Sequence, residues 1–218
     1  PTRSNLDIHV AQTQGELGYL LMNAIAAPVT CLLTRVVVDA ELGPAVKPIG
    51  PILAARPPDP AVAVQVTGGW RLVVPSPRPA NILETDAIAT QLRTHHVIAG
   101  GGGGVPLTAD GTPVSAVVDK DWVASLLALA LDAERLVFAT DVDHVYEHFG
   151  QPDAAPLERL SLERARELLD TDALAPGSMA PKVASAVDFV AATGRSANIC
   201  ALQDIGAALA DTAGTVIA

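Results

Sequence analysis

The feature that most constrains this chain is a run of five consecutive glycines, Gly100–Gly104, which directly follows a short apolar segment, Val97–Ala99. Short apolar segments of this kind are typical of buried strands. Glycine has no Cβ atom, so a glycine backbone can approach a ligand closely and turn its N–H groups toward an anion. The run therefore predicts an anion-binding turn at the end of a strand. A flexible turn without a ligand is the alternative interpretation.

A second unusual feature follows the glycines, because Asp119-Lys120-Asp121 opens an apolar helix. Helix N-termini bind phosphates, and a lysine there can meet the charge that grows on a transferring phosphoryl group. A solvated helix start, with aspartates favoured by the helix dipole, is the alternative. Lys182 occupies another loop–helix junction, and Lys47 lies in a proline-rich segment. The three lysines together suggest a phosphate-handling site.

Apolar segments alternate with segments of helical periodicity along the chain, and this alternation predicts an α/β fold. Half of the residues are hydrophobic but only 3% are aromatic, so Ala, Val and Leu must fill the core. We expect a three-layer α/β/α sandwich with a mostly parallel open sheet. The predicted strands and helices include strands at 29–38, 97–99, 135–139 and 198–202, and helices at 5–25, 86–93, 161–169 and 182–190.

Residues 39–79 differ from the rest of the chain, because proline and glycine crowd this stretch. The segment Lys47-Pro48-Ile49-Gly50-Pro51 cannot form a regular helix. We expect a small protruding β-rich subdomain here, inserted in a single domain that spans residues 1–218. Irregular appendages commonly carry function, so this subdomain is a candidate lid.

Several functional classes are disfavoured by composition and spacing. The net charge of −10 argues against nucleic-acid and membrane partners. Cys31 and Cys200 are predicted to be free thiols of a cytoplasmic protein, and no apolar run is long enough to span a bilayer. The glycine run fits neither a Walker A loop nor a dinucleotide fingerprint, and no His/Cys/Asp set has metal-ligand spacing.

Seven segments, taken together and in this order, resemble the carbamate kinases of the amino acid kinase superfamily. The resemblance covers nearly the whole chain, and its proline- and glycine-containing strings are far more specific than any single glycine motif. The segments are AQTQGELGYLL (11–21), VKPIGP (46–51), GWRLVVPSPRP (69–79), AGGGGGVP (99–106), VVDKDWVASLLA (117–128), TDVDHVYEHFGQP (140–152) and APGSMAPKV (175–183).

The resemblance implies reversible phosphoryl transfer between carbamoyl phosphate and ADP, which gives ATP and carbamate. Under this resemblance, Lys120 contacts the transferring phosphoryl group and Asp121 holds the lysines in place. Lys182 neutralises the phosphates of the nucleotide, and Lys47 closes over the carbamoyl phosphate. Catalysis of this kind depends on positioning and positive charge rather than on a nucleophile.

The resemblance also assigns ligand-binding groups and partners. Gly101 and Gly102 would offer backbone N–H groups to the substrate. The cofactor set would be ATP or ADP with Mg²⁺, and the protein would be a cytoplasmic homodimer, commonly in arginine breakdown. The implied nucleotide-binding residues are Asp141, Val142, Tyr146, Gly177, Ser178 and Met179.

The chain departs from the family pattern in places. Nothing before Asn5 supplies the family's N-terminal strand and Gly-Gly-Asn turn, and the segments at 26–28 and 40–46 are shorter than the family's. Two alternatives therefore stand beside a carbamate kinase. One is a non-catalytic nucleotide-binding or dimerisation module, and the other is an amino-acid-kinase-fold enzyme with a different acid substrate.

Overall fold

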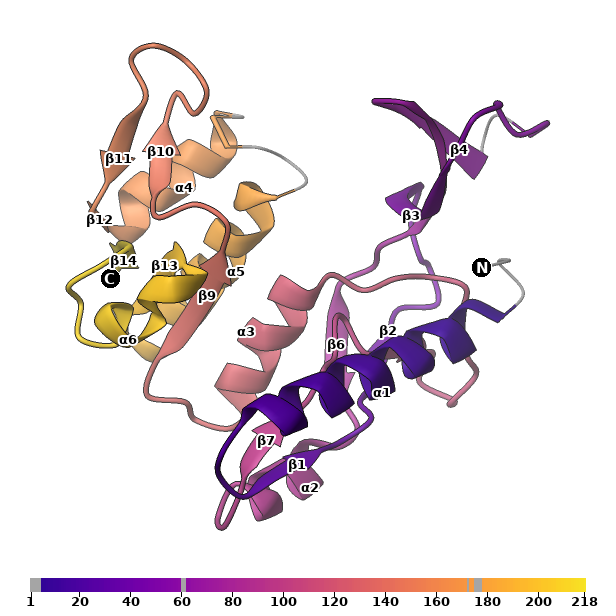
Figure 1. The fold of residues 1–218 in the computed structure, drawn as a ribbon, viewed down its shortest axis with the longest axis horizontal. Coiled ribbons are helices and arrows are strands. Elements are labelled where there is room, and N and C mark those ends of the chain that lie inside the picture. The colour runs from indigo at the N-terminus through magenta and orange to yellow at the C-terminus, as the bar shows by residue number, and fades with distance from the viewer. Residues whose placement is uncertain (1–4, 60–61, 172, 175–177) are drawn as a thin grey trace. The chain divides into compact units, whose positions relative to one another are not determined.

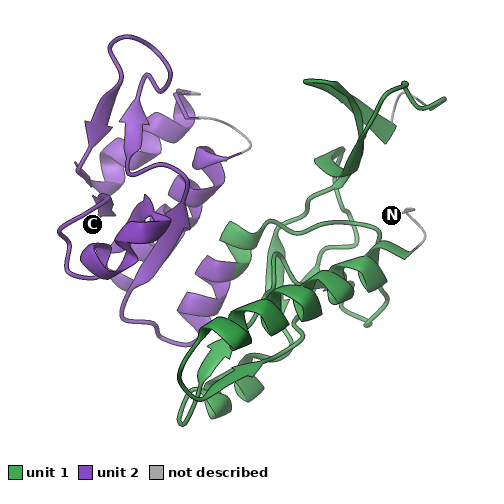
Figure 2. Cartoon of the chain, viewed as in Figure 1, with its two compact units in different colours: residues 1–123 green, residues 124–218 purple. Residues whose placement is uncertain are grey.

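The computed structural model describes residues 5–59, 62–171, 173–174 and 178–218. The chain divides into two compact units, residues 1–123 and 124–218, which Figure 2 shows in different colours. Within the described residues, no helix is long and apolar enough to cross a membrane. The units are described in turn, with the elements labelled as in Figure 1.

Unit 1 begins with a long helix, α1 (Leu6–Ala24), and contains two small open sheets besides the sheet at 45–75. In one sheet, β1 (Val29–Cys31) runs parallel to β7 (His96–Ile98). In the other, β2 (Arg35–Val38) pairs in parallel with β8 (Val105–Leu107) and antiparallel with β6 (Pro79–Ile82). A short helix, α2 (Thr85–Gln91), connects β6 to β7.

The predicted strand at residues 29–38 is two strands instead of one. Its first part joins the sheet of β7 and its second part joins the sheet of β8, with the chain turning out of both sheets at residues 32–34. At the break, the backbone N–H and C=O of Thr34 are both hydrogen-bonded to the side-chain amide of Gln14, a contact that the prediction did not include. An apolar run carries no sign of such a break.

Residues 45–75, within the predicted lid range of 39–79, form a separate antiparallel sheet. The middle strand is β5 (Gly69–Pro75), with β3 (Ala45–Leu53) on one side and β4 (Ala63–Val66) on the other. Ile49 and Val74 of this sheet are buried against Leu6 at the start of α1. That the sheet acts as a lid stays a prediction.

Unit 2 is built on one four-stranded sheet in the order β12-β14-β13-β9. The strand β13 (Ala197–Ala201) is buried along its whole length and runs parallel to β9 (Leu136–Thr140). The helix α5 (Met179–Thr193) contributes Val183, Ala186, Phe189 and Val190 to the apolar core below this sheet. The other strands are β12 (Arg159–Leu160) and β14 (Thr215–Ile217).

The remaining elements of unit 2 frame this core. The amphipathic helix α4 (Leu162–Asp170) begins as predicted, because the Ser161 hydroxyl accepts a hydrogen bond from Arg164 N at 3.2 Å. A hairpin of β10 (Val145–Glu147) and β11 (Ala155–Leu157) and the strand β14 were not predicted. A short 3₁₀ turn at Leu202–Asp204 leads into α6 (Ile205–Ala208). The fold is thus α/β with open sheets, as the alternation of segments predicts.

Candidate active site

The glycine run forms a tight turn that is closely packed at Gly101, Gly103 and Gly104. Gly104 N donates to Gly100 O at 3.0 Å, which closes the turn. Gly100, Gly101, Gly102 and Gly104 all have positive φ angles, which other residues rarely adopt. A Cβ atom on Gly103 would lie 1.7 Å from the carbonyl oxygen of Val118, so only glycine fits there. The sequence of the turn is therefore required by its packing, and the interpretation as a flexible spacer fails.

The contact with Val118 brings the glycine turn next to the Asp119-Lys120-Asp121 motif, which starts α3 (Lys120–Ala130). Asp119 is the residue before this helix, and its Oδ1 accepts a hydrogen bond from Asp121 N at 2.9 Å. Both aspartates are buried, whereas the Lys120 side chain is 60% exposed. The interpretation as a solvated helix start thus holds for the lysine and is wrong for the two aspartates.

Lys47 is bound to this helix start by an ion pair. Its Nζ lies 2.5 Å from Oδ2 of Asp119. Oδ2 of Asp119 thus binds Lys47, while Oδ1 accepts the hydrogen bond from the helix start. Burial raises the pKa of Asp119, but the hydrogen bonds from Lys47 and from the Asp121 backbone lower it more, and the net pKa is below the ordinary value. Asp119 was not among the predicted site residues.

Asp121 was predicted to hold the lysines, and this role stays a prediction. Asp121 Oδ2 lies 3.9 Å from Lys120 Nζ, and Asp119 contacts Lys47. The motif's spacing alone could not separate the two, since both carboxylates flank the same lysine.

Two further contacts connect the sheet at 45–75 to the same segment. Val117 N donates to Pro75 O at 3.1 Å, at the end of β5. The Arg78 guanidinium lies 3.7 Å from the ring centre of Trp122, in the range of a cation–π contact. Together with the ion pair of Lys47 and Asp119, these contacts attach the sheet at 45–75 to residues 117–122.

A pocket in unit 2 is lined by most of the predicted nucleotide-binding residues. Its walls include Asp141, Val142 and Tyr146, which follow β9 along the chain, and Ser178 and Met179 at the start of α5. The Tyr146 hydroxyl donates to Asp143 Oδ1 at 2.8 Å, which orients the ring. The predicted residue Gly177 lies outside the described residues. The remaining wall residues are His144, Phe149, Ala173 and Leu174.

Lys182 lies in the first turn of α5, a few residues from Ser178 and Met179 of the pocket. Its side chain is buried, with 5% of the residue surface exposed. A lysine in the first turn of a helix adds its charge to the positive end of the helix dipole, which favours an anion nearby. The position suits the predicted role beside the phosphates of a nucleotide.

The chain contains three lysines in all, and every one is a predicted site residue. Lys47 and Lys120 belong to unit 1 with Gly101 and Gly102, and Lys182 belongs to unit 2 with the pocket residues. Arginines supply all other permanent positive charges. This distribution separates the residues that would bind a small phosphorylated substrate from those that would bind a nucleotide.

Among the residues that the structure describes, no three His, Cys, Asp or Glu side chains are grouped so that they could hold a metal ion. Mg²⁺ commonly binds through one or two carboxylates together with the phosphates of a nucleotide, so such an ion would not need a cluster of protein ligands.

Comparisons with known proteins place the chain in one family. The chain matches the amino acid kinase family over residues 31–200. The carbamate kinase of Escherichia coli (strain K12) is 39% identical over 97% of this chain and 75% of its own length. That of Lentilactobacillus hilgardii is 37% identical over 237 residues, which cover 97% of this chain and 74% of the relative. The alignment with this relative is 237 positions long, which exceeds the 218 residues of this chain, so the relative has internal residues that this chain lacks.

Solved structures give the same result. The carbamate kinase from Giardia lamblia bound to AMP-PNP has a TM-score of 0.84 and 32% identity, and the match covers 97% of this chain and 74% of that one. A crystal structure from Aeropyrum pernix K1 has a TM-score of 0.85 and 36% identity, with 97% and 75% covered.

Proposed function

Because the chain belongs to the carbamate kinase family, within the amino acid kinases, it is a phosphotransferase, and we propose that it transfers a phosphoryl group between carbamoyl phosphate and ADP. The products are ATP and carbamate, and the reaction is reversible. The observation that carries the proposal is that the glycine turn, the Asp119-Lys120-Asp121 motif and Lys47 are joined by direct contacts in unit 1.

In unit 1, the proposed ligand is carbamoyl phosphate. Backbone N–H groups of Gly101 and Gly102 donate to its phosphoryl oxygens, and Lys120 stabilises the charge that develops during transfer. The exposure of Lys120 suits this role, because its ammonium group is accessible to a ligand from solvent. No nucleophilic side chain is required, since ADP itself attacks the phosphorus.

Lys47 is proposed to change partners when carbamoyl phosphate binds. In the structure its ammonium group is paired with Asp119. The phosphoryl group carries more negative charge than one carboxylate, so it competes with Asp119 for Lys47, while Asp119 Oδ1 keeps its bond to the helix. The sheet at 45–75 would carry this lysine toward the substrate and act as the lid.

In unit 2, the pocket is proposed to bind the nucleotide. Its apolar wall residues, including Val142, Tyr146 and Met179, suit a purine base, while Lys182 is placed for the phosphates. We propose that Mg²⁺ enters with these phosphates, where it would supply charge neutralisation. The reaction consumes ADP and forms ATP, which suits the cytoplasm.

A homodimer is proposed on the basis of α1. Its second half exposes large apolar side chains to solvent, which is unusual for a monomer surface. A light-scattering mass of twice the chain mass, reduced to one by Leu20→Glu, would support this; a monomeric wild type would exclude it. The exposed residues are Leu17, Tyr19, Leu20, Leu21 and Met22.

ATP formation from ADP and carbamoyl phosphate tests the catalytic proposal. Wild-type protein should form ATP in the presence of Mg²⁺, and acetyl phosphate should support a much lower rate. Nucleotide binding without turnover would favour a non-catalytic module instead. A higher rate with another acyl phosphate would favour a different acid substrate.

A further inference from the structure

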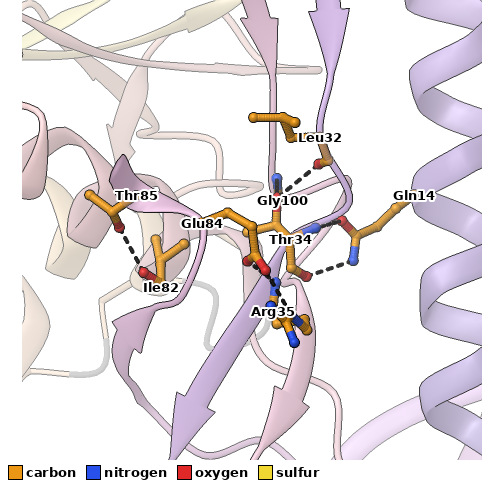
Figure 3. A network of polar contacts seen from close by, with 8 residues as sticks. All are labelled: Gln14, Leu32, Thr34, Arg35, Ile82, Glu84, Thr85 and Gly100. Atoms are coloured by element: carbon orange, nitrogen blue, oxygen red, sulfur yellow. Dashed lines mark hydrogen bonds and ion pairs between the residues drawn. The ribbon is translucent and has the colours of Figure 1, made fainter. Parts of the chain in front are cut away.

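Gln14 is a buried polar side chain whose amide binds the backbone of one residue, Thr34 (Figure 3). Its Nε2 donates to Thr34 O at 3.0 Å, and Thr34 N donates to its Oε1 at 2.8 Å. Gln14 is 1% exposed and Thr34 is fully buried, so water cannot replace these bonds. The amide of Gln14 thus supplies the acceptor for Thr34 N and one of the donors to Thr34 O.

Thr34 in turn holds both ends of the glycine turn. Its hydroxyl donates its only proton to Leu32 O at 3.0 Å, so it accepts the hydrogen bond from Gly100 N at 2.8 Å. Its carbonyl oxygen accepts a second bond from Val105 N at 2.8 Å. Figure 3 shows the connection from Gln14 through Thr34 to Gly100. The residues that bracket the turn, Gly100 and Val105, are therefore both bonded to Thr34.

Gln14 also supports the turn directly. A Cβ atom on Gly101 would lie 2.6 to 2.7 Å from Cγ, Cα and Cβ of Gln14, so the Gly101 backbone rests on this side chain. A Cβ atom on Gly102 would meet nothing within 4 Å, so the next residue faces open space. The turn thus has one supported side at Gly101 and one open side at Gly102, where a ligand can approach.

We propose that Gln14 and Thr34 are positioning residues that set the shape of the glycine turn and, through it, the affinity for carbamoyl phosphate. Neither side chain touches substrate. Gln14 orders the backbone of Thr34, and Thr34 fixes the two ends of the turn whose Gly101 and Gly102 N–H groups bind the phosphoryl oxygens. This inference rests on the proposed function and names residues to which that function gives no role.

Matched variants separate a positioning role from a general loss of folding. Thr34→Val keeps the shape but removes the acceptor for Gly100 N, while Thr34→Ser keeps the hydroxyl. Gln14→Met keeps the length of the side chain but removes the amide oxygen and the amide nitrogen. Gln12→Met makes the same change at an exposed position of α1. The measurement is the KM for carbamoyl phosphate and the KM for ADP in the direction of ATP formation.

We expect Thr34→Val and Gln14→Met to raise the KM for carbamoyl phosphate by about tenfold or more, because small displacements of binding groups are costly. The KM for ADP should stay within about twofold of wild type, and Thr34→Ser and Gln12→Met should resemble wild type for both substrates. Equal changes in both KM values, or no change for carbamoyl phosphate, would overturn the inference.

Amide hydrogen exchange tests the positioning without relying on turnover. In Thr34→Val, the amides of Gly100 and Gly104 should exchange about tenfold or more faster than in wild type, while those of β13 in unit 2 keep their rates. Unchanged exchange in the turn would refute the inference even if the wild type formed no ATP. Absence of ATP formation together with faster exchange would instead contradict only the proposed function.

Discussion

The strands of unit 1 fall into separate small sheets, whereas most strands of unit 2 belong to one four-stranded sheet. Unit 1 has buried apolar residues of its own, such as Val36, Val74 and Ile88, but polar contacts also join its separate elements: Gln14 binds Thr34 and Lys47 binds Asp119. In unit 2, one continuous cluster of buried apolar residues lies between the sheet and its helices. We expect the polar contacts of unit 1 to orient ligand-binding groups, while hydrophobic burial in the core of unit 2 supplies much of its stability.

This contrast has a measurable form. Substitutions at the polar contacts of unit 1 should change kinetic constants more than stability, because each contact orients a ligand-binding group. Substitutions in the core of unit 2 should change stability and leave the kinetic constants of the folded enzyme nearly unchanged. The following variants test both statements, from the largest expected effect to the smallest.

Phe189→Ala should have the largest effect, and it should be on stability. Phe189 is fully buried in the core of unit 2, so truncation removes its packing and leaves a cavity. We expect a loss of about 3 to 5 kcal/mol in the free energy of unfolding, measured by urea denaturation. Phe149→Ala changes the same residue type at a position that is 63% exposed and should cost far less. Equal losses would show that unit 2 does not depend on its core.

Lys120→Ala should reduce the rate and leave stability alone. Removal of a charge that stabilises the transition state typically costs about 10²-fold or more in kcat. The exposed side chain contributes little to packing, so the unfolding midpoint should move by less than about 2 °C. Arg93→Ala, at an exposed cation of the same unit, is the control and should keep the wild-type rate. A large drop in stability would assign Lys120 a structural role.

Asp119→Asn should have a moderate effect with a distinct pH dependence. The amide oxygen can still accept from Asp121 N, so this variant removes only the charge that pairs with Lys47. We expect the free energy of unfolding at pH 7, measured by urea denaturation, to fall by about 1 to 2 kcal/mol. Asp119→Ala also removes the acceptor for Asp121 N at the helix start, so its free energy of unfolding should fall by about 1 kcal/mol more.

The pH dependence follows from the lowered pKa of Asp119. A carboxyl group with a lowered folded-state pKa contributes stability that is fully present above the ordinary value of 3.8 and is lost as the pH falls through the folded value. The stability difference between wild type and Asp119→Asn should therefore be constant from pH 5 to 8 and shrink below about pH 4. A difference that did not change in acid would show that the pair contributes nothing.

Tyr146→Ala should have the smallest effect and should act on one substrate. If the pocket of unit 2 binds the nucleotide, loss of this ring raises the KM for ADP by about tenfold, which corresponds to about 1.4 kcal/mol. Tyr146→Phe keeps the ring and loses only the bond to Asp143, so about a twofold change is expected. A change in the KM for carbamoyl phosphate would contradict the division of ligands between the units.

Local sequence signals predicted the elements that depend on local chemistry. The helix at α4 follows from its amphipathic pattern and from Ser161, whose hydroxyl caps it as expected. The pairing of β14 with β13 could not be predicted, because β14 is only three residues long and α6 separates it from β13. The break at Thr34 was missed because its contact with Gln14 joins residues 20 positions apart in the sequence.

The site shows the same limit. Family resemblance indicated which residues to examine, and five of the six predicted nucleotide residues line one pocket. It could not indicate that Asp119 pairs with Lys47, because this contact joins residues 72 positions apart and depends on a side-chain direction. Glycines were easier to interpret than carboxylates, since positive φ angles and close packing leave glycine few substitutes.

The placement of the lysines has a consequence for chemical labelling. Because Lys47, Lys120 and Lys182 are the only ε-amines of the chain, reagents that acylate or alkylate such amines have no lysine target outside the proposed site. Lys120 is the most exposed of the three and should react first, whereas Lys182 is shielded. Apart from a terminal α-amine, an ordinary amine-coupling reagent should therefore modify the proposed site and inhibit the enzyme, and attachment to a surface should use another functional group.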